Sequence, residues 1–297
     1  MTEGVLNVLK PPGMTSSDVV GEIRRIYQMK RVGHTGTLDP GAAGVLPICL
    51  GRATRLFDYL VDKQKEYLAE LFIGWETDTQ DAYGAAVRRS ERRVGLSEIS
   101  GILPAFVGEQ DQTAPLYSAV RVEGKQMYKL ARSGVRLDPA DRKIRRIRVD
   151  GLELLGQTGE DRFLLRISCG KGTYVRTLCQ DIAAALGTAG HMSYLLRVKS
   201  GDFRIEGAYT LEELRQMTEA ELQAAPVSME AALHRLPAAR LELDEGGARR
   251  LLNGASVPFE GAAGAPHRVY CNGVFCGIGL RESQGFHLSV YLKEEHG

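Results

Sequence analysis

The stretch that organises this chain reads Gly33-His34-Thr35-Gly36-Thr37-Leu38-Asp39-Pro40-Gly41-Ala42-Ala43-Gly44-Val45-Leu46-Pro47. It holds four glycines and two prolines within fifteen residues. That composition is typical of a rigid, specially folded loop and of neither a helix nor a strand. Because His34 and Asp39 both lie in this loop, the first question is what a fixed Asp39 carboxylate would do at the mouth of a cleft.

Length and composition indicate an ordinary globular protein. The 297 residues are 43% hydrophobic, which is enough for one large core and a small second domain. The chain has no run of eighteen apolar residues, and its N-terminus lacks the basic and then apolar build of a signal peptide, so we expect a cytoplasmic protein. The five cysteines are odd in number and form no CxxC pair, which argues against a disulfide framework or a zinc ribbon.

Charge is distributed unevenly. The formal net charge of +1 does not by itself indicate a nucleic-acid partner. Between Arg121 and Arg148, however, ten Lys and Arg residues face only three acids. A basic surface of this kind suits phosphate contacts, because each neutralised phosphate releases counterions. A solvated charged face is the alternative, and charge alone does not decide between the two.

Hydrophobic periodicity predicts a mixture of strands and helices. Strands are expected at residues 5–9, 65–73, 145–155 and 162–169, the last two as an antiparallel pair. Helices are expected after Ser16 or Ser17 and over residues 52–60, 96–106, 175–186 and 210–225. The alternation in 65–73 places Tyr67 on the inward face of its strand.

The turn at residues 168–178 runs from a strand through two glycines into a helix. Such a turn directs backbone N–H groups, with Lys171 or Arg176, at whatever lies above it, and is a good anion site. The Walker spacing is absent here and in the loop at 33–47, so nucleotide hydrolysis is not expected. No cluster of His, Cys and Asp has metal-ligand spacing either.

From about Pro237 the hydrophobic pattern of the sequence changes to short strand-like runs. Asn272-Gly273 stands between two apolar runs and is a strong type I′ hairpin signal. Residues 286–292 alternate again. This end of the chain therefore predicts a small β-rich terminal domain.

Ordered motifs over residues 5–205 resemble the signature of the bacterial tRNA pseudouridine-55 synthase (TruB) family. The motif in the loop is accompanied, in the family's order, by those at residues 10–16, 65–67, 77–84, 117–119, 131–134, 171–176 and 191–197. The resemblance implies an α+β fold, a pseudouridine-synthase mixed, largely antiparallel sheet flanked by helices, with a small C-terminal β-rich PUA-like domain. It divides the chain into a catalytic domain at 1–236, with a basic RNA-binding insertion at about 120–148, and a PUA-like RNA-binding domain at 237–297.

The same resemblance implies an isomerase that converts the uridine at position 55, in the T-arm of tRNA, to pseudouridine. The reaction breaks the N1–C1′ bond, rotates the base and rejoins it through C5, so it needs a carboxylate but no energy source, cofactor or metal. Asp39 matches the family's catalytic aspartate. It could attack the base or C1′, or act as a base at C2′, and the sequence does not choose among these. In isolation, Asp39-Pro40-Gly41 would be only a turn.

The resemblance also assigns substrate-binding roles. Arg176 is expected to pair with Asp39 and keep it ionised; its alternative is a surface arginine. Tyr67 is expected to stack on the target base and help to remove the C5 proton, and Leu195 to line the uracil pocket; both would otherwise be core residues. Asp81 is expected to form hydrogen bonds in the pocket or to hold its own loop.

His34 is the candidate for filling the space that a flipped uridine leaves, since a base in a folded arm reaches a cleft only by leaving its stack. A structural hydrogen bond is its alternative role. The T-arm of tRNA is the only partner implied: no membrane and no protein partner are required, and a monomer is expected. Two other readings stay open, an RNA-binding or tRNA-folding protein with a secondary catalytic role, and a metal-dependent or phosphate-ester hydrolase that uses the glycine loop.

Overall fold

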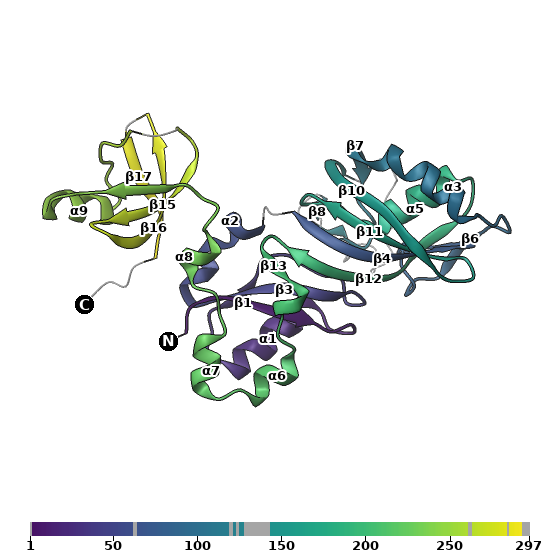
Figure 1. Ribbon diagram of the computed structural model, residues 1–297, viewed down its shortest axis with the longest axis horizontal. Coiled ribbons are helices and arrows are strands. Elements are labelled where there is room, and N and C mark those ends of the chain that lie inside the picture. The colour runs from purple at the N-terminus through teal and green to yellow at the C-terminus, as the bar shows by residue number, and fades with distance from the viewer. Residues whose placement is uncertain are drawn as a thin grey trace.

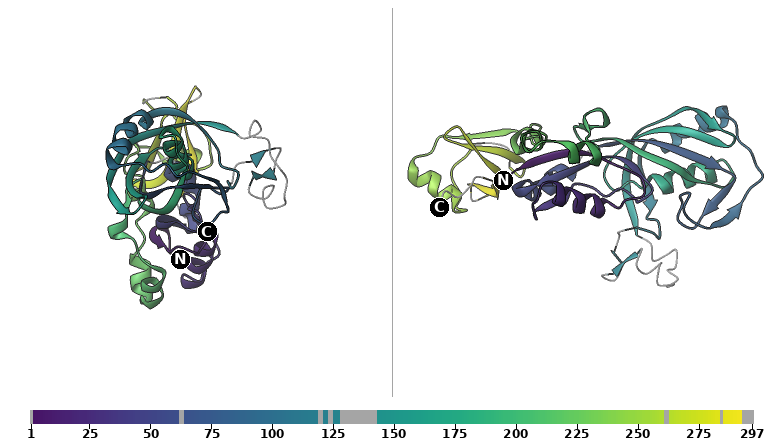
Figure 2. Two further views of the ribbon diagram at one scale, coloured as in Figure 1. Left: turned by 90° about the vertical axis from the view of Figure 1, so that its right-hand side faces the viewer. Right: turned by 90° about the horizontal axis from the view of Figure 1, so that it is seen from below.

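The computed structural model describes residues 2–61, 64–118, 121–122, 125–127, 143–260, 263–283 and 285–292. The molecule is elongated (Figure 1), with a large sheet and its helices over most of its length and a second sheet at the end that carries the C-terminus. Seen from below (Figure 2), the short hairpin of β8 (Arg121–Val122) and β9 (Lys125–Gln126) stands clear of the large sheet.

The large sheet has nine strands within the described residues, in the order β1-β3-β12-β4-β11-β10-β7, with β2 paired to β3 and β13 to β12. These strands are β1 (Gly4–Lys10), β2 (Val32–His34), β3 (Ala43–Leu50), β4 (Lys65–Ile73), β7 (Gly108–Thr113), β10 (Ile144–Gly159), β11 (Arg162–Cys169), β12 (Gly190–Ser200) and β13 (Phe203–Arg204). The pairing of β3 with β12 is parallel and the others are antiparallel. The expected mixed, largely antiparallel sheet is therefore confirmed.

Helices flank this sheet and connect its strands. They are α1 (Ser16–Ile26), α2 (Phe57–Val61), α3 (Leu96–Ile102), α5 (Val175–Ala185), α6 (Leu211–Gln216), α7 (Glu219–Ala224), α8 (Met229–Ala232) and α9 (Glu245–Leu252), with 3₁₀ turns η1 (Gly51–Leu56), η2 (Leu103–Phe106) and η4 (Ile205–Gly207). In the part of the chain that the structure describes, no helix combines the length and the apolar character needed to cross a membrane.

The core lies where α5 covers the inward faces of β4 and β11. Buried and half-exposed residues alternate along β4, and Tyr67 lies on the buried side as predicted. Leu178 and Ile182 of α5 pack into the same apolar cluster as Leu165 and Ile167 of β11. Burial of these side chains stabilises the contact by about 1.5–3 kcal/mol for each large aliphatic group, so the start of α5 is held firmly over the sheet.

The loop predicted at 33–47 is shorter than expected. Gly33 and His34 belong to β2, and residues 43–47 begin β3, so the irregular segment is residues 35–42. Every residue of β3 is buried, and its backbone pairs with β1 on one side and with β12 or β2 on the other. Because these pairings satisfy the backbone groups, sheet packing overrides the local preference of glycine and proline.

Two helix predictions need correction. The helix expected at 210–225 is divided into α6 and α7, with Met217 extended (φ −68°, ψ 143°) between them. The division has a local cause, since Thr218 and Glu221 form a second capping box that starts α7. The N-cap of α1 is Thr15, in a capping box with Asp18, and not Ser16 or Ser17.

The C-terminal sheet consists of β14 (Ala238–Leu241), β15 (Pro266–Cys271), β16 (Val274–Glu282) and β17 (Gly285–Tyr291). The hairpin predicted at Asn272-Gly273 joins β15 to β16, and both residues have the positive φ that a type I′ turn needs (50° and 78°). Arg52 and Arg55, in η1, donate hydrogen bonds to the carbonyls of Leu292 and Tyr291. These bonds tie the end of the second sheet to the segment that follows β3.

Candidate active site

The segment 35–42 is braced from two neighbouring elements, β1 and α1. The Ser16 hydroxyl accepts a hydrogen bond from the Leu38 amide (2.9 Å) and donates one to the Leu38 carbonyl (3.2 Å). The Pro40 carbonyl accepts from Lys10 Nζ (3.2 Å) and from the Gly13 amide (2.8 Å). A loop whose backbone is satisfied in this way presents its side chains in one arrangement.

Arg197, on β12, braces the segment from the third side. Its side chain is 1% exposed, and it donates from Nε to the Val45 carbonyl (2.7 Å) and from Nη2 to the Gly36 carbonyl (3.2 Å). It also hydrogen-bonds the Tyr67 side chain. One buried guanidinium therefore joins the loop, β3 and β4.

Asp39 starts a turn that the Ala42 amide closes on the Asp39 carbonyl (3.0 Å). Its carboxylate meets Arg176 through two contacts, Nε to Oδ2 at 2.9 Å and Nη2 to Oδ1 at 3.3 Å. Arg176 lies in the first turn of α5, is 4% exposed, and donates further hydrogen bonds to the carbonyls of Thr79 (2.9 Å) and Tyr117 (3.0 Å). These acceptors hold the guanidinium in place, so the pair does not depend on Asp39 alone.

The protonation of Asp39 reflects opposing influences. Burial raises the pKa of Asp39, the charges of Arg176 and Lys10 lower it, and the nearby carboxylate of Asp81 raises it, with a net shift upward. The expected action of Arg176, favouring the ionised form, is present, but burial exceeds it. The Asp39 side chain is still 39% exposed, so a ligand can reach the carboxylate.

Asp81 lies beside this pair. Its Oδ1 accepts hydrogen bonds from Thr79 Oγ1 (2.6 Å) and from the Tyr83 amide (3.0 Å), and its Oδ2 lies 4.0 Å from Arg176 Nη1. The carboxylate therefore holds its own turn and also faces the guanidinium.

Tyr67 and Leu195 form the apolar wall next to Asp39. They are 8% and 6% exposed and share a cluster with Leu38 and Ala42, which lie on either side of Asp39-Pro40-Gly41. Burial raises the pKa of the Tyr67 hydroxyl, the charge and hydrogen bond of Arg197 lower it, and the Asp39 charge raises it. The tyrosine is neutral at physiological pH in this setting.

His34 is half-buried at the end of β2. Its Nδ1 accepts a hydrogen bond from the Gly36 amide (3.3 Å), so in the neutral ring the proton lies on Nε2. Burial and the positive charge of Arg197 lower the pKa of His34. The imidazole is therefore uncharged at neutral pH.

Comparisons with known proteins identify the family of the chain. Residues 24–175 match the family described as TruB family pseudouridylate synthase (N terminal domain), and residues 176–236 match the tRNA pseudouridylate synthase B C-terminal domain. The chain is 40% identical to tRNA pseudouridine synthase B of Alkaliphilus oremlandii over 98% of this chain and 90% of that protein. It is 43% identical to the protein of that name from Caldanaerobacter subterraneus subsp. tengcongensis, over 95% and 96%.

The chain belongs to the TruB family of pseudouridylate synthases. It is therefore a pseudouridine synthase, an isomerase. Among solved structures, one of a Cbf5–Nop10–Gar1 complex has a chain with a TM-score of 0.72 and 27% identity, covering 98% of this chain and 84% of that one. The resemblance that the sequence motifs gave is confirmed.

The structure brings some of the predicted site residues of this TruB-family chain into direct contact, but not all of them. Asp39, Arg176 and Asp81 meet directly, and Tyr67 and Leu195 belong to the apolar cluster that includes Leu38 and Ala42. Two of the groups that could bind an anion at the turn before α5 already have partners. Arg176 is already paired with Asp39, and the Tyr174 amide at the helix start donates to Gln112 Oε1 (2.8 Å).

The basic stretch of this synthase falls largely outside the described residues, as do residues 128–142, which include the motif at 131–134. Two of its arginines on β10 have acidic neighbours beyond the counted range. Arg146 lies near Glu109 and Asp111, and Arg148 pairs with Asp150 at 2.6 Å. The acidic neighbours of these two arginines therefore offset part of the positive charge that was counted along the sequence.

Three supporting residues of the synthase were missed by sequence reasoning. Lys10 and Arg197 are fully buried cations, and Ser16 was considered only as a helix cap. A usable signal existed for Arg197, because it stands two residues after Leu195 on one strand and so shares its face. Lys10 ends an almost wholly buried strand, where a lysine requires partners.

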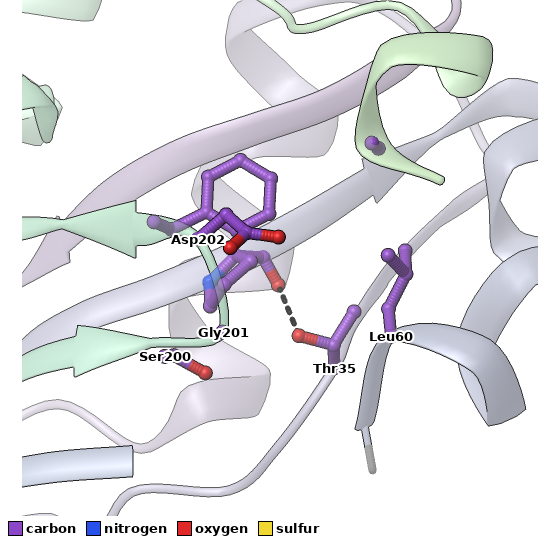
Figure 3. Close-up of a pocket in the computed structure, with 8 residues that line it drawn as sticks. Thr35, Leu60, Ser200, Gly201 and Asp202 are labelled. Carbon is purple, nitrogen blue, oxygen red and sulfur yellow. Dashed lines mark hydrogen bonds between the residues drawn. The ribbon is translucent and has the colours of Figure 1, made fainter. Parts of the chain in front are cut away.

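This TruB-family chain has a small cavity beside Thr35 and Pro47, and Asp39 does not line it. Figure 3 shows Thr35, Leu60 and Ser200 to Asp202 around it, with the Thr35 hydroxyl donating to the Pro47 carbonyl at 3.5 Å. It has room for about one water molecule. Within the described ranges no three His, Cys, Asp or Glu side chains gather as metal ligands.

Proposed function

We propose that this enzyme isomerises the uridine at position 55, in the T-arm of tRNA, with the Asp39 carboxylate as catalyst. The observation that carries the proposal is the pair of Asp39 and Arg176, in which a partly exposed carboxylate is held by a buried guanidinium with other fixed acceptors. Relatives named tRNA pseudouridine synthase B, at 40% and 43% identity over nearly the whole chain, support tRNA as the substrate.

In this reaction the ionised Asp39 attacks the base or C1′, or removes the proton at C2′, and Arg176 keeps it oriented for each route. Tyr67 stacks on the uracil ring and assists the loss of the C5 proton, and Leu195 lines the uracil pocket. Their burial next to the catalytic turn supports these roles, because an apolar wall excludes water from the detached base.

The uridine reaches Asp39 by leaving its stack, at a cost of a few kcal/mol. His34 occupies the vacated space in the RNA. Its neutral ring and its position five residues before Asp39, at the end of the strand that leads into the braced segment 35–42, support this role, because the fold fixes both side chains relative to one another.

The proposed division into a catalytic domain (1–236) and a PUA-like RNA-binding domain (237–297) is supported by the separate C-terminal sheet. The basic insertion at about 120–148 contacts the phosphates of the RNA arm. Although the similar Cbf5 chain is in a complex with Nop10 and Gar1, we propose that this enzyme acts as a monomer, with tRNA as its only required partner.

The decisive experiment compares the wild type with Asp39→Asn, which keeps the size of the side chain and removes its charge. We expect the variant to bind unmodified tRNA but to release no tritium from C5-labelled uridine. Normal release by the variant would exclude Asp39 as the catalyst. Normal tRNA folding by a wild type that forms no pseudouridine would favour the RNA-folding reading.

Mass mapping of pseudouridine after incubation of tRNA with the protein alone tests the position and the independence from partners. The same assay after dialysis against EDTA addresses the hydrolase reading. We expect full activity, because the chemistry needs only a carboxylate. Loss of activity that Mg²⁺ or Zn²⁺ restores would contradict the expectation.

A further inference from the structure

Tyr83 places an exposed aromatic ring on the catalytic turn. It lies between β5 (Trp75–Thr77) and β6 (Ala86–Arg89), and it is 75% exposed. A Cβ atom added to Gly41 would lie 2.0 Å from Cε2 and 2.6 Å from Cζ of this tyrosine. The ring therefore lies directly on Gly41, two residues after Asp39 and inside the turn that Ala42 closes.

The backbone beneath the ring is fixed. The Tyr83 amide donates to Asp81 Oδ1 (3.0 Å), the Thr77 hydroxyl donates to the Asp81 carbonyl (2.6 Å), and the Ala85 amide donates to Asp78 Oδ1 (2.9 Å). A tyrosine has only two side-chain torsions, so a ring on such a base loses little freedom when a ligand covers it.

The chemistry around the ring selects the ligand. Asp78 and Asp81 belong to the same connection, and Asp39 lies in the turn beneath it. Arg176 offsets only part of the charge of these three carboxylates, so a phosphate is disfavoured beside the ring. The face of an uncharged nucleobase has no such conflict, and stacking on aromatic rings is the usual way in which proteins hold unstacked bases.

We propose that Tyr83 is a stacking platform for a nucleobase next to the uridine that enters the site. This inference rests on the proposed function, in which the target base is extruded from an RNA loop. Extrusion deprives the bases on both sides of the uridine of a stacking partner. His34 covers one of them from the vacated space, and the exposed ring beside Asp39 covers the other. Tyr83 is thus a substrate-binding residue and takes no part in the bond changes.

The test compares Tyr83→Ala with Tyr83→Phe in steady-state assays on unmodified tRNA. Stacking requires the ring but not the hydroxyl, so we expect Tyr83→Ala to raise KM about tenfold with little change in kcat, and Tyr83→Phe to match the wild type. Tyr194→Ala is the matched control, since that tyrosine is 45% exposed on β12 and should leave KM unchanged. An unchanged KM in Tyr83→Ala, or an equal loss in Tyr83→Phe, would overturn the proposal.

Gly41→Ala provides a second measurement, because its methyl group would displace the ring without removing it. Gly41 is not among the residues with a positive φ, so the backbone accepts alanine. We expect Gly41→Ala alone to raise KM, but we expect it to raise KM little further when it is combined with Tyr83→Ala. Fully additive effects would contradict the proposed contact.

Failure of this inference is separable from failure of the proposed function. The affinity of a T-arm stem–loop RNA is measured for Asp39→Asn with and without Tyr83→Ala. No binding by the single variant and no pseudouridine formation by the wild type would overturn the proposed function. Binding that Tyr83→Ala does not weaken would overturn only the role of Tyr83.

Discussion

Arg176 and Asp39 are 137 positions apart in the sequence, yet the guanidinium Nε lies 2.9 Å from the carboxylate Oδ2. The contact joins the start of α5 to the turn between β2 and β3. Because the guanidinium also donates to two backbone carbonyls, it remains in place when the carboxylate moves to a substrate. The pair can therefore serve both as an anchor and as a control on the charge of Asp39.

Removal of the positive charge of Arg176 should change the pH dependence of the reaction. The pKa of Asp39 is already above its ordinary value because of burial, and Arg176 opposes the rise. In the proposed mechanism Asp39 acts in its ionised form, so we expect the single-turnover rate to fall as the pH falls through this pKa. In Arg176→Met we expect the acid limb of the rate profile to move to higher pH and the plateau rate to fall by about 100-fold.

Arg176→Lys is the control for this prediction, since it keeps the positive charge and loses the two-contact geometry. We expect a lower plateau but a smaller shift of the acid limb than in Arg176→Met. An acid limb at the same pH in all three proteins would show that Asp39 is not the titrating group.

Lys10 makes stability depend on pH at the alkaline side. Its side chain is fully buried, and burial lowers its pKa from 10.5 to about 8. Between these values the unfolded chain holds a proton that the folded protein has lost, so this group makes the free energy of unfolding rise with pH over that window and leaves it constant below about pH 8. The rise amounts to at most roughly 3 kcal/mol.

Urea denaturation of the wild type and Lys10→Met over this pH range measures the contribution as the difference between the two proteins. The exposed Lys30→Met variant supplies the background from other groups. A difference between the wild type and Lys10→Met that stays constant over this range would contradict the lowered pKa.

Gly44 marks the closest approach of two strands at the site. Its φ is +119°, and an added Cβ would lie 2.2 Å from the Arg197 carbonyl oxygen on β12. We expect Gly44→Ala to reduce the free energy of unfolding by at least about 3 kcal/mol. Gly21, in α1, has no neighbour within 4 Å, so Gly21→Ala should stabilise the protein by about 0.5–1 kcal/mol. Equal stability of the two variants in urea denaturation would refute the first expectation.

Local patterns predicted the parts of the fold that local physics determines. The alternation in β4 and β11 reflects one buried face in each strand. Asn272 and Gly273 both accept the positive φ that a type I′ turn needs. β12 had no such signal. Register shifts after Met192 and after Arg197 interrupt its period of two, so the strand that holds both Leu195 and Arg197 was not predicted from periodicity.

The site was predictable to the extent that ordered motifs carried it. Asp39 and Arg176 followed from the resemblance, whereas the sequence indicates at most the burial of Lys10 and Arg197 and not the groups that they contact. Lys10 donates to the nearby carbonyls of Pro11 and Met14, but its contact with the loop is to a carbonyl 30 positions away, and Arg197 reaches one 161 positions away. No local window contains these two contacts with the loop, and only the folded sheet brings the groups together.

The bracing of the loop by Arg197 also has a consequence during synthesis on the ribosome. The Gly36 carbonyl is made 161 residues before the guanidinium that holds it. A nascent chain can thus form β1 to β3 and the contacts of Ser16 and Lys10 with the loop early, but Arg197 joins them only when β12 has emerged and closed the sheet. The bracing around Asp39 is therefore completed late in translation, and a chain that stops before β12 carries the aspartate in an incompletely braced loop.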